Sequence, residues 1–237
     1  MMEITLTKKP KNPIIVEGFP GFGLVGTIAS EFLIDHLKTE QIGRIMFPEM
    51  PAMAAIHEGK LVEPLGIFYN EAYNMVILHA ITASTGIEWK LADALLEIAK
   101  QLNAKEIISL EGVGSSGIKL ASEAFFYTNQ PKKAELLQNI GLKPLNEGII
   151  IGVTGAILLK GGNFPLASFF ADTASNLPDS KAAAKIIEAL DKYLGLKVDY
   201  QPLLKQAKQF EEKLSTILEQ SQKTQDISEK KKLSYVG

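Results

Sequence analysis

Short apolar runs rich in β-branched residues alternate with amphipathic segments over about the first 200 residues, and this alternation constrains the fold most. The pattern is typical of helices packed on a largely parallel sheet. We expect strands at residues 13–17, 43–47, 74–81, 105–110, 148–153 and 166–171. Two further runs, residues 52–57 and 61–69, flank a Glu-Gly-Lys turn and predict a hairpin, which would bring antiparallel strands into the sheet. The sequence therefore predicts a mixed sheet.

Helix signals occupy the segments between these strands. The spacing of apolar residues and of helix-ending residues predicts helices over residues 85–102, 131–141 and 179–195. The first would begin with a capping box formed by Thr85 and Glu88, and the last with the N-cap Asp179. The apolar faces of these helices are expected to form core.

A glycine-rich segment joins the first predicted strand to the helix that follows it. Residues Gly21 to Gly26 match G-x-G-x-x-G in the strand-to-helix context of a dinucleotide-binding domain. Three features argue against a bound dinucleotide. Three extra residues separate the strand from the motif, no acidic residue ends a second strand about 20 positions on, and Phe19 and Phe22 crowd the loop. We therefore expect no cofactor.

A second glycine-rich segment, Glu111 to Gly117, follows the predicted strand 105–110, and such loops gather where ligands bind in open α/β sheets. Its serines lack the G-x-S-x-G spacing of a nucleophile, and no segment fits a phosphate-binding loop. Glu17 and Glu111 each end a predicted strand and could approach each other. Such a carboxyl pair could support acid–base chemistry if burial moved the two pKa values apart. We favour the alternative, in which both accept hydrogen bonds from glycine-loop amides.

Composition removes several classes of function. The chain has no cysteine, which excludes disulfides, thiol nucleophiles and cysteine-ligated metals. Its net charge is -2 and Arg44 is its single arginine, so a nucleic-acid protein is a poor expectation. The histidines His36, His57 and His79 lack metal-ligand spacing and are expected to be surface or hydrogen-bonded core imidazoles. We predict no metal site and no catalytic residue.

The first eleven residues lack the pattern of a signal peptide, and the longest apolar stretches are too short to span a bilayer. The expected place of the protein is the cytoplasm, away from membranes. Three parts are expected along the chain: a core domain at residues 1–201, an amphipathic helix at 202–222 and a flexible tail at 223–237.

The helix at 202–222 carries one narrow apolar seam, and two interpretations of it stay open. The favoured one packs the seam on its own domain. The other makes it a subunit interface, with four candidate contact residues: Leu203, Phe210, Leu214 and Ile217. The tail beyond it ends in an apolar and aromatic cluster, Leu233-Ser234-Tyr235-Val236-Gly237, which has no core to join.

The segment from Glu17 to Gly26 resembles the opening signature of the proteasome assembly chaperone family, particularly its archaeal members. The resemblance continues in shorter blocks to about residue 213. It implies a three-layer α/β/α domain with a mixed sheet, similar to nucleoside phosphorylases and related hydrolases but without their catalytic residues. It also implies that the glycine motifs are structural turns, formed by Gly18, Gly21, Gly23, Gly26, Gly112 and Gly114.

The resemblance implies a non-enzymatic protein that assists assembly of the proteasome α-ring or acts as an ATP-independent activator of the core particle. Its expected partners are proteasome α subunits, further copies of itself and a paralogous protein. Members of this kind dock a carboxyl-terminal hydrophobic–tyrosine–any-residue motif between α subunits. Here the tyrosine is third from the end and a serine holds the hydrophobic place, so we expect binding through Leu233, Tyr235, Val236 and Gly237.

Two other interpretations stay open. One is a phosphorylase- or hydrolase-like enzyme, or a nucleotide-binding protein, that uses the glycine loops at residues 21–26 and 112–117. The other is a scaffold whose carboxyl-terminal helix only builds a homo-oligomer. The sequence does not give the oligomer number, and it does not choose between assembly and activation.

Overall fold

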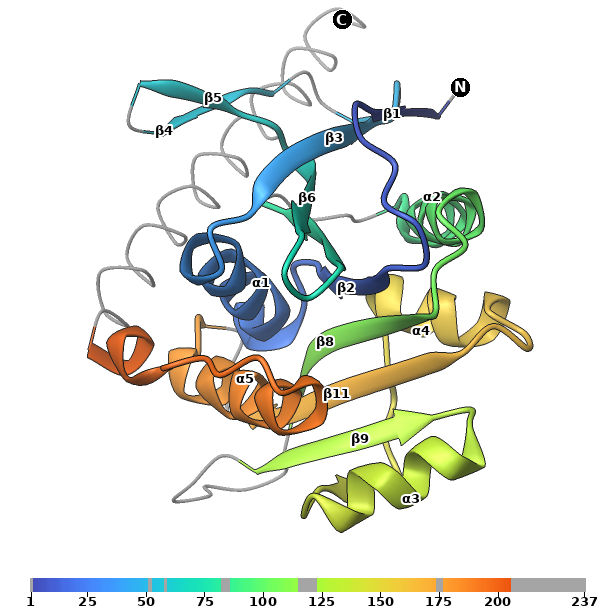
Figure 1. Ribbon diagram of the computed structural model, residues 1–237, viewed down its shortest axis with the longest axis vertical. Coiled ribbons are helices and arrows are strands. Elements are labelled where there is room, and N and C mark those ends of the chain that lie inside the picture. Colours follow the sequence, from blue (N-terminus) through green and yellow to red (C-terminus); the bar gives the residue numbers. More distant parts are fainter. Residues whose placement is uncertain are drawn as a thin grey trace, which may run out of the picture.

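The structure is a computed structural model that describes residues 2–50, 53–57, 59–81, 86–114, 123–173 and 177–205. These residues form a nine-stranded sheet with helices on both faces (Figure 1). The strand order is β1-β3-β6-β7-β2-β8-β11-β9-β10. The strands are β1 Glu3–Leu6, β2 Ile14–Gly18, β3 Glu40–Met46, β6 Leu65–Asn70, β7 Met75–Ala80, β8 Glu106–Gly114, β9 Ala124–Thr128, β10 Lys143–Pro144 and β11 Leu166–Thr173.

The centre of the sheet is parallel and its flanks contain antiparallel pairs. Strands β7, β2, β8 and β11 run in one direction, whereas β6 pairs antiparallel with β7 and β9 pairs antiparallel with β11. The predicted mixed sheet is therefore confirmed. Because the four central strands are parallel, their carboxyl ends lie along one edge, which is where ligands bind in α/β folds.

Helices cover both faces of the sheet, which gives the predicted three layers (Figure 1). Helices α1 (Val25–His36) and α5 (Ser180–Leu194) pack together on one face. Helices α2 (Glu88–Gln101) and α4 (Gly152–Lys160) pack together on the other. A shorter helix, α3 (Pro131–Asn139), lies against β9 and β10. In the described part of the chain, none of the helices has the length and apolarity to cross a membrane.

The predicted helix ends are confirmed for α3 and α5 and corrected for α2. Asp179 caps α5 by accepting a hydrogen bond from the Ala182 amide at 2.9 Å, and Gly195 ends it with φ 66°. Helix α2 begins at Glu88, and the Glu88 carboxylate accepts from the Gly86 amide at 2.9 Å. The predicted capping box would make Glu88 the third residue of the helix, and this is wrong because Glu88 is the first. The other residue of the box, Thr85, lies outside the described residues.

The predicted strand at residues 148–153 is wrong. Helix α4 begins at Gly152, whose φ is 82°, and Ile149 and Ile151 before it are 91% and 76% exposed. The isoleucine run has a high strand propensity, but the position beside β11 is taken by β9, which the sequence patterns did not predict. Tertiary pairing therefore overrode the local preference.

The predicted hairpin forms, but outside the main sheet. Strands β4 (Ala55–His57) and β5 (Lys60–Val62) pair with each other as a separate two-stranded sheet, seen beyond β3 in Figure 1. The run predicted at 61–69 is divided, and its second part, β6, joins the main sheet between β3 and β7. Strand β1, at the sheet edge, was not predicted.

Candidate functional site

Two glutamates meet at the carboxyl ends of β2 and β8. Glu17 and Glu111 point to the sheet face covered by α4, where the Thr154 hydroxyl oxygen lies between them. Thr154 Oγ1 is 3.1 Å from Glu17 Oε1 and 3.2 Å from Glu111 Oε2. The expected approach of the two carboxyls is confirmed, and we call Glu17 and Glu111 the carboxyl pair.

Backbone amides contact the other oxygens of the carboxyl pair. The Phe19 amide donates to Glu17 Oε2 at 3.3 Å, and the Gly112 amide donates to Glu111 Oε1 at 3.1 Å. The Phe22 amide also donates to the Glu111 carboxyl. The favoured interpretation, in which both glutamates accept hydrogen bonds from glycine-rich segments, agrees with these contacts. These hydrogen bonds connect residues 18–23, which we call the glycine turn, to the sheet.

Burial changes the acidity of the carboxyl pair. Glu17 is 0% and Glu111 8% exposed, and loss of solvation disfavours the charged form of each. Burial raises the pKa of Glu17 to about 7, against hydrogen bonds from Ser109, Thr154 and the Phe19 amide that lower it. Burial first, and then repulsion by Glu17, raise the pKa of Glu111 to about 8. Both groups therefore titrate near neutral pH.

Most glycines of the two motifs lie where a side chain would collide. A Cβ at Gly21 would lie 2.0 Å from Glu111 Oε1, and one at Gly112 would lie 2.0 Å from the Phe22 carbonyl oxygen. Similar collisions arise at Gly18, Gly23 and Gly26. At Gly114 the nearest atom, 3.4 Å away, is in ordinary contact. The Glu111 carboxyl therefore fills the space beside Gly21, where a side chain would otherwise lie.

The second glycine segment is strand rather than loop over its described part. Strand β8 continues to Gly114, so Glu111, Gly112 and Gly114 belong to the sheet. The predicted strand end at residue 110 is therefore wrong by four residues, because residues 111–114 continue to pair with β11. The serines and Gly117 of this segment lie outside the described residues.

On the opposite face of the sheet, one histidine contacts a serine and a glutamate. His79 on β7 places Nδ1 2.9 Å from Ser30 Oγ and Nε2 2.7 Å from Glu31 Oε2, both on α1. His79 is thus a hydrogen-bonded core imidazole, one of the two expected environments. Its acidic partner was not predicted, because Glu31 lies in a different element. Ser30 is 0% exposed, so this serine–histidine–glutamate set has no accessible nucleophile.

The other predicted residues lie in different environments or outside the described residues. His36 is exposed and stacks on Phe32 with ring centroids 5.3 Å apart, and His57 lies in β4. Leu203 is 2% exposed and packs in the core cluster of α1 and α5, as in the interpretation that places the seam on its own domain. The remaining candidates lie outside the described residues: Phe210, Leu214, Ile217, Leu233, Tyr235, Val236 and Gly237.

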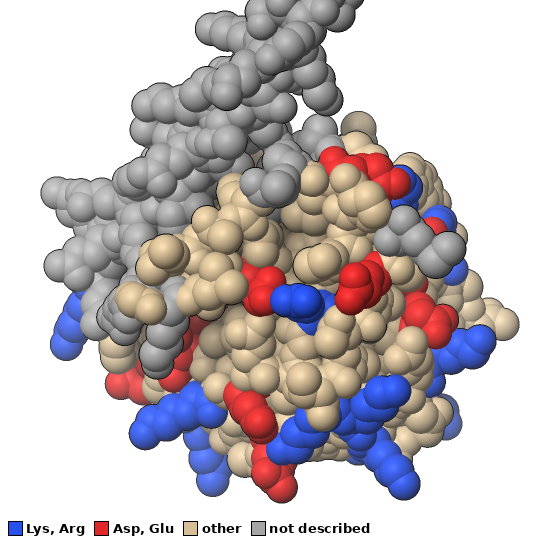
Figure 2. Space-filling view, turned by 90° about the horizontal axis from the view of Figure 1, so that it is seen from above, with Lys and Arg blue, Asp and Glu red and all other residues tan. Residues whose placement is uncertain are grey.

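The described residues form no metal cluster, and charges of both signs lie on one face of the molecule (Figure 2). Among the described residues, no group of three or more histidines and acids could hold a metal ion. On the face in Figure 2, acidic and basic side chains are interspersed over the described part.

The fold and the glycine turn agree with a known family. The PAC2 family model matches residues 15–218, and the chain belongs to the PAC2 family. The resemblance to archaeal proteasome assembly chaperones is therefore confirmed.

Individual relatives match nearly the whole chain. The structure of Pyrococcus furiosus PbaA, an archaeal homolog of proteasome-assembly chaperone, is 31% identical, covers 95% of this chain and 100% of its own, and has a TM-score of 0.86. An uncharacterized protein of Methanocaldococcus jannaschii is 27% identical over 95% of this chain and 94% of its own length. Pyrococcus furiosus PbaB, an archaeal proteasome activator, shares the fold at 22% identity, with 91% and 98% coverage and a TM-score of 0.75.

Proposed function

We propose that this chain is a non-enzymatic protein that binds the proteasome, as an assembly chaperone or as an ATP-independent activator. The observation that carries the proposal is the match to PbaA, an archaeal homolog of proteasome-assembly chaperone, over 95% of this chain and 100% of PbaA. The shared fold with PbaB, an archaeal proteasome activator, is consistent with either role. We further propose that the protein acts in the cytoplasm as a homo-oligomer, alone or with a paralogous protein.

The proposed contact is the tail. Leu233, Tyr235, Val236 and Gly237 would insert into pockets between α subunits, with residues 223–232 as a tether. Buried aromatic anchors, such as the proposed Tyr235, contribute a large share of the binding energy at protein interfaces. A flexible tether of this length spans about 16–19 Å, and several tails on one oligomer would bind a symmetric ring with avidity.

The test is co-migration of the purified protein with proteasome α subunits, with and without residues 233–237. We expect the full chain to co-migrate and the shortened chain to lose association while keeping its circular dichroism spectrum. A matched pair, Tyr235→Ala and Ser234→Ala, separates the anchor from its neighbour, since only the first removes an aromatic ring. Equal binding by the shortened chain would contradict the tail contact, whereas no binding by the full chain would contradict the function itself.

A second candidate function is supported by the carboxyl pair. Two glutamates with pKa values of about 7 and about 8 lie at the carboxyl ends of parallel strands, where α/β enzymes bind substrates. A phosphorylase- or hydrolase-like enzyme, or a nucleotide-binding protein, would use such groups. Calorimetric titration with nucleosides, nucleotides and dinucleotides tests this candidate, and heat of binding that disappears in Glu111→Gln would support it. Absence of binding would contradict this second candidate, and the chaperone proposal would then be the one that remains.

A further inference from the structure

One hydroxyl lies between the two carboxyls of the pair. Thr154 Oγ1 is within hydrogen-bond distance of Glu17 Oε1, at 3.1 Å, and of Glu111 Oε2, at 3.2 Å. A threonine hydroxyl carries a single proton and can donate it to only one of these oxygens. The second contact becomes a hydrogen bond only when the other carboxyl is protonated and donates to Thr154 Oγ1. Both contacts are therefore hydrogen bonds only if the two carboxyls retain a proton between them.

Among the described residues, the charged groups on the surrounding elements do not replace this proton. In the part of the chain that the structure describes, the titratable residues on the elements packed over this face are Asp172 on β11, Lys160 on α4, and Glu88, Lys90, Asp93, Glu97 and Lys100 on α2. Asp172 is itself acidic. Lys160 is six residues beyond Thr154, about 9 Å along the helix, and pairs with Asp93 at 2.5 Å. His79 with Glu31, and Glu106 with Lys133, lie on the opposite face of the sheet.

The carboxyl pair is connected directly to the glycine turn. Its oxygens accept hydrogen bonds from the Phe19 and Phe22 amides at the two ends of the turn, and the Glu111 carboxyl fills the space beside Gly21. Full ionisation would place two unneutralised carboxylates side by side in the core and would leave the Thr154 hydroxyl with only one of its two hydrogen bonds. Such a buried charge pair is strongly unfavourable and is relieved when one group moves to water.

We propose that the carboxyl pair retains a proton at neutral pH and that this proton, held through Thr154, fastens the glycine turn to the sheet, so that the turn loosens when the proton is lost. The sign of the pH effect follows from the direction of the shifts. The pKa values are raised from 4.5 to about 7 and about 8, so the stabilising contribution is complete below 4.5 and is lost as the pH rises through 7 and 8. This switch is a property of the core and is independent of proteasome binding.

The test is the pH dependence of urea unfolding and of amide hydrogen exchange at Phe22, in the wild type and in Glu111→Gln. Glutamine imitates the protonated carboxyl, because its carbonyl can accept from the Gly112 amide while its NH₂ group donates to Thr154. Between about pH 6 and about pH 9 we expect the Phe22 protection factor to fall about tenfold or more in the wild type and about threefold or less in the variant. We also expect the variant to have the higher urea midpoint at the alkaline end.

The matched control is Glu135→Gln, which removes an exposed carboxyl from α3 and should keep the wild-type pH profile. Infrared spectroscopy adds a direct measurement that does not require the variant to fold: the wild type at neutral pH should show the C=O stretch of a protonated carboxyl, and the urea-unfolded chain should not. Parallel pH profiles of wild type and Glu111→Gln, or no protonated carboxyl in the folded wild type at neutral pH, would overturn the proposal.

Discussion

Strand β8 carries two buried glutamates, one at its beginning and one three residues before its end, and their charges are compensated in different ways. Glu106, at its beginning, is 6% exposed and Glu111, near its end, is 8% exposed, so burial does not distinguish them. The Glu106 carboxylate forms an ion pair with Lys133 of α3 and accepts a hydrogen bond from the Tyr193 hydroxyl of α5, whose oxygen lies 3.1 and 3.2 Å from the two carboxylate oxygens. Glu111 faces a second carboxyl, Glu17.

The difference lies in what neutralises each charge. A cation compensates the carboxylate at the beginning of β8, whereas a proton must do so at its end. Burial raises the pKa values of the carboxyl pair to about 7 and about 8, within the physiological range. The proposed loss of its proton therefore makes that part of the strand sensitive to pH, whereas Lys133 provides the counter-charge of Glu106.

The largest expected effect comes from removing the cation. Lys133→Met keeps an unbranched side chain of similar length but leaves the buried Glu106 carboxylate without its counter-charge. Loss of one partner of a buried pair is strongly destabilising, and we expect the free energy of unfolding to fall by about 3 kcal/mol. Urea unfolding at neutral pH measures this loss.

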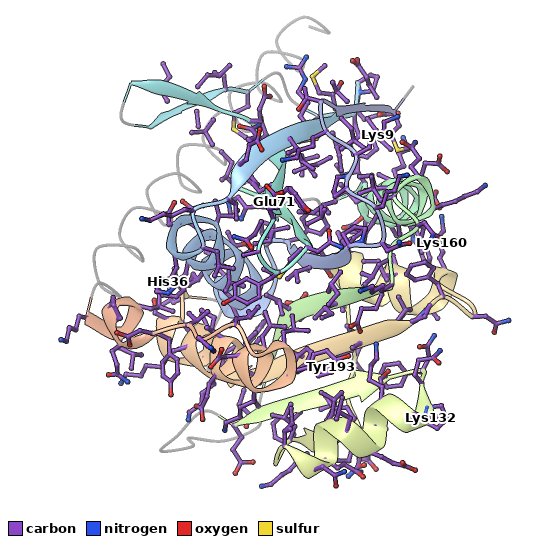
Figure 3. All side chains as sticks on the ribbon, in the orientation of Figure 1. Lys9, His36, Glu71, Lys132, Lys160 and Tyr193 are labelled. Carbon is purple, nitrogen blue, oxygen red and sulfur yellow. The ribbon has the colours of Figure 1, made fainter. Side chains whose placement is uncertain are left out.

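The neighbouring lysine provides the control for this prediction. Lys132 is exposed on the same helix, and Figure 3 shows it on α3 at the outer side of the molecule. Lys132→Met should change the free energy of unfolding by less than about 0.5 kcal/mol. Equal effects of the two substitutions would mean that the ion pair at the beginning of β8 contributes nothing beyond surface charge.

A smaller effect is expected from a steric change at the other end of β8. Gly21→Ala alters no charge, but its Cβ would lie 2.0 Å from Glu111 Oε1 and would displace that carboxyl from the amides it binds. Gly21 has φ -141°, which alanine tolerates, so the cost is the collision itself. We expect a loss of about 2 kcal/mol in urea unfolding. Gly114→Ala, with its nearest atom at 3.4 Å, is the control and should be close to neutral.

The two ends of β8 also differ in how far the sequence predicts them. Glu17 and Glu111 each end or nearly end a strand, and carboxyl ends of parallel strands share one edge, so their approach could be expected. Thr154, which joins them, could not, since the isoleucine run before it predicted a strand where α4 begins. Lys133 and Tyr193 lie 27 and 87 residues from Glu106, and no local pattern connects them. Periodicity thus predicted most strands, but pairing across elements depends on tertiary packing.

The smallest effect is expected for the second partner of Glu106. Tyr193 lies on α5 beside the sheet (Figure 3), and its ring packs against Phe169 with centroids 5.8 Å apart. Burial, and then the Glu106 carboxylate, raise the pKa of Tyr193 above that of a free phenol. Tyr193→Phe keeps the ring contact and removes only the hydroxyl.

We expect Tyr193→Phe to lower the free energy of unfolding by about 1 kcal/mol, the usual net contribution of one hydrogen bond. The control is Tyr127→Phe on β9, where the side chain is 44% exposed and the loss of the hydroxyl should cost less. In the background of Lys133→Met, the same substitution should cost more, because Tyr193 then provides the only remaining side-chain donor among the described partners of Glu106. Additive losses in this double-mutant cycle would show that the lysine and the tyrosine stabilise Glu106 independently.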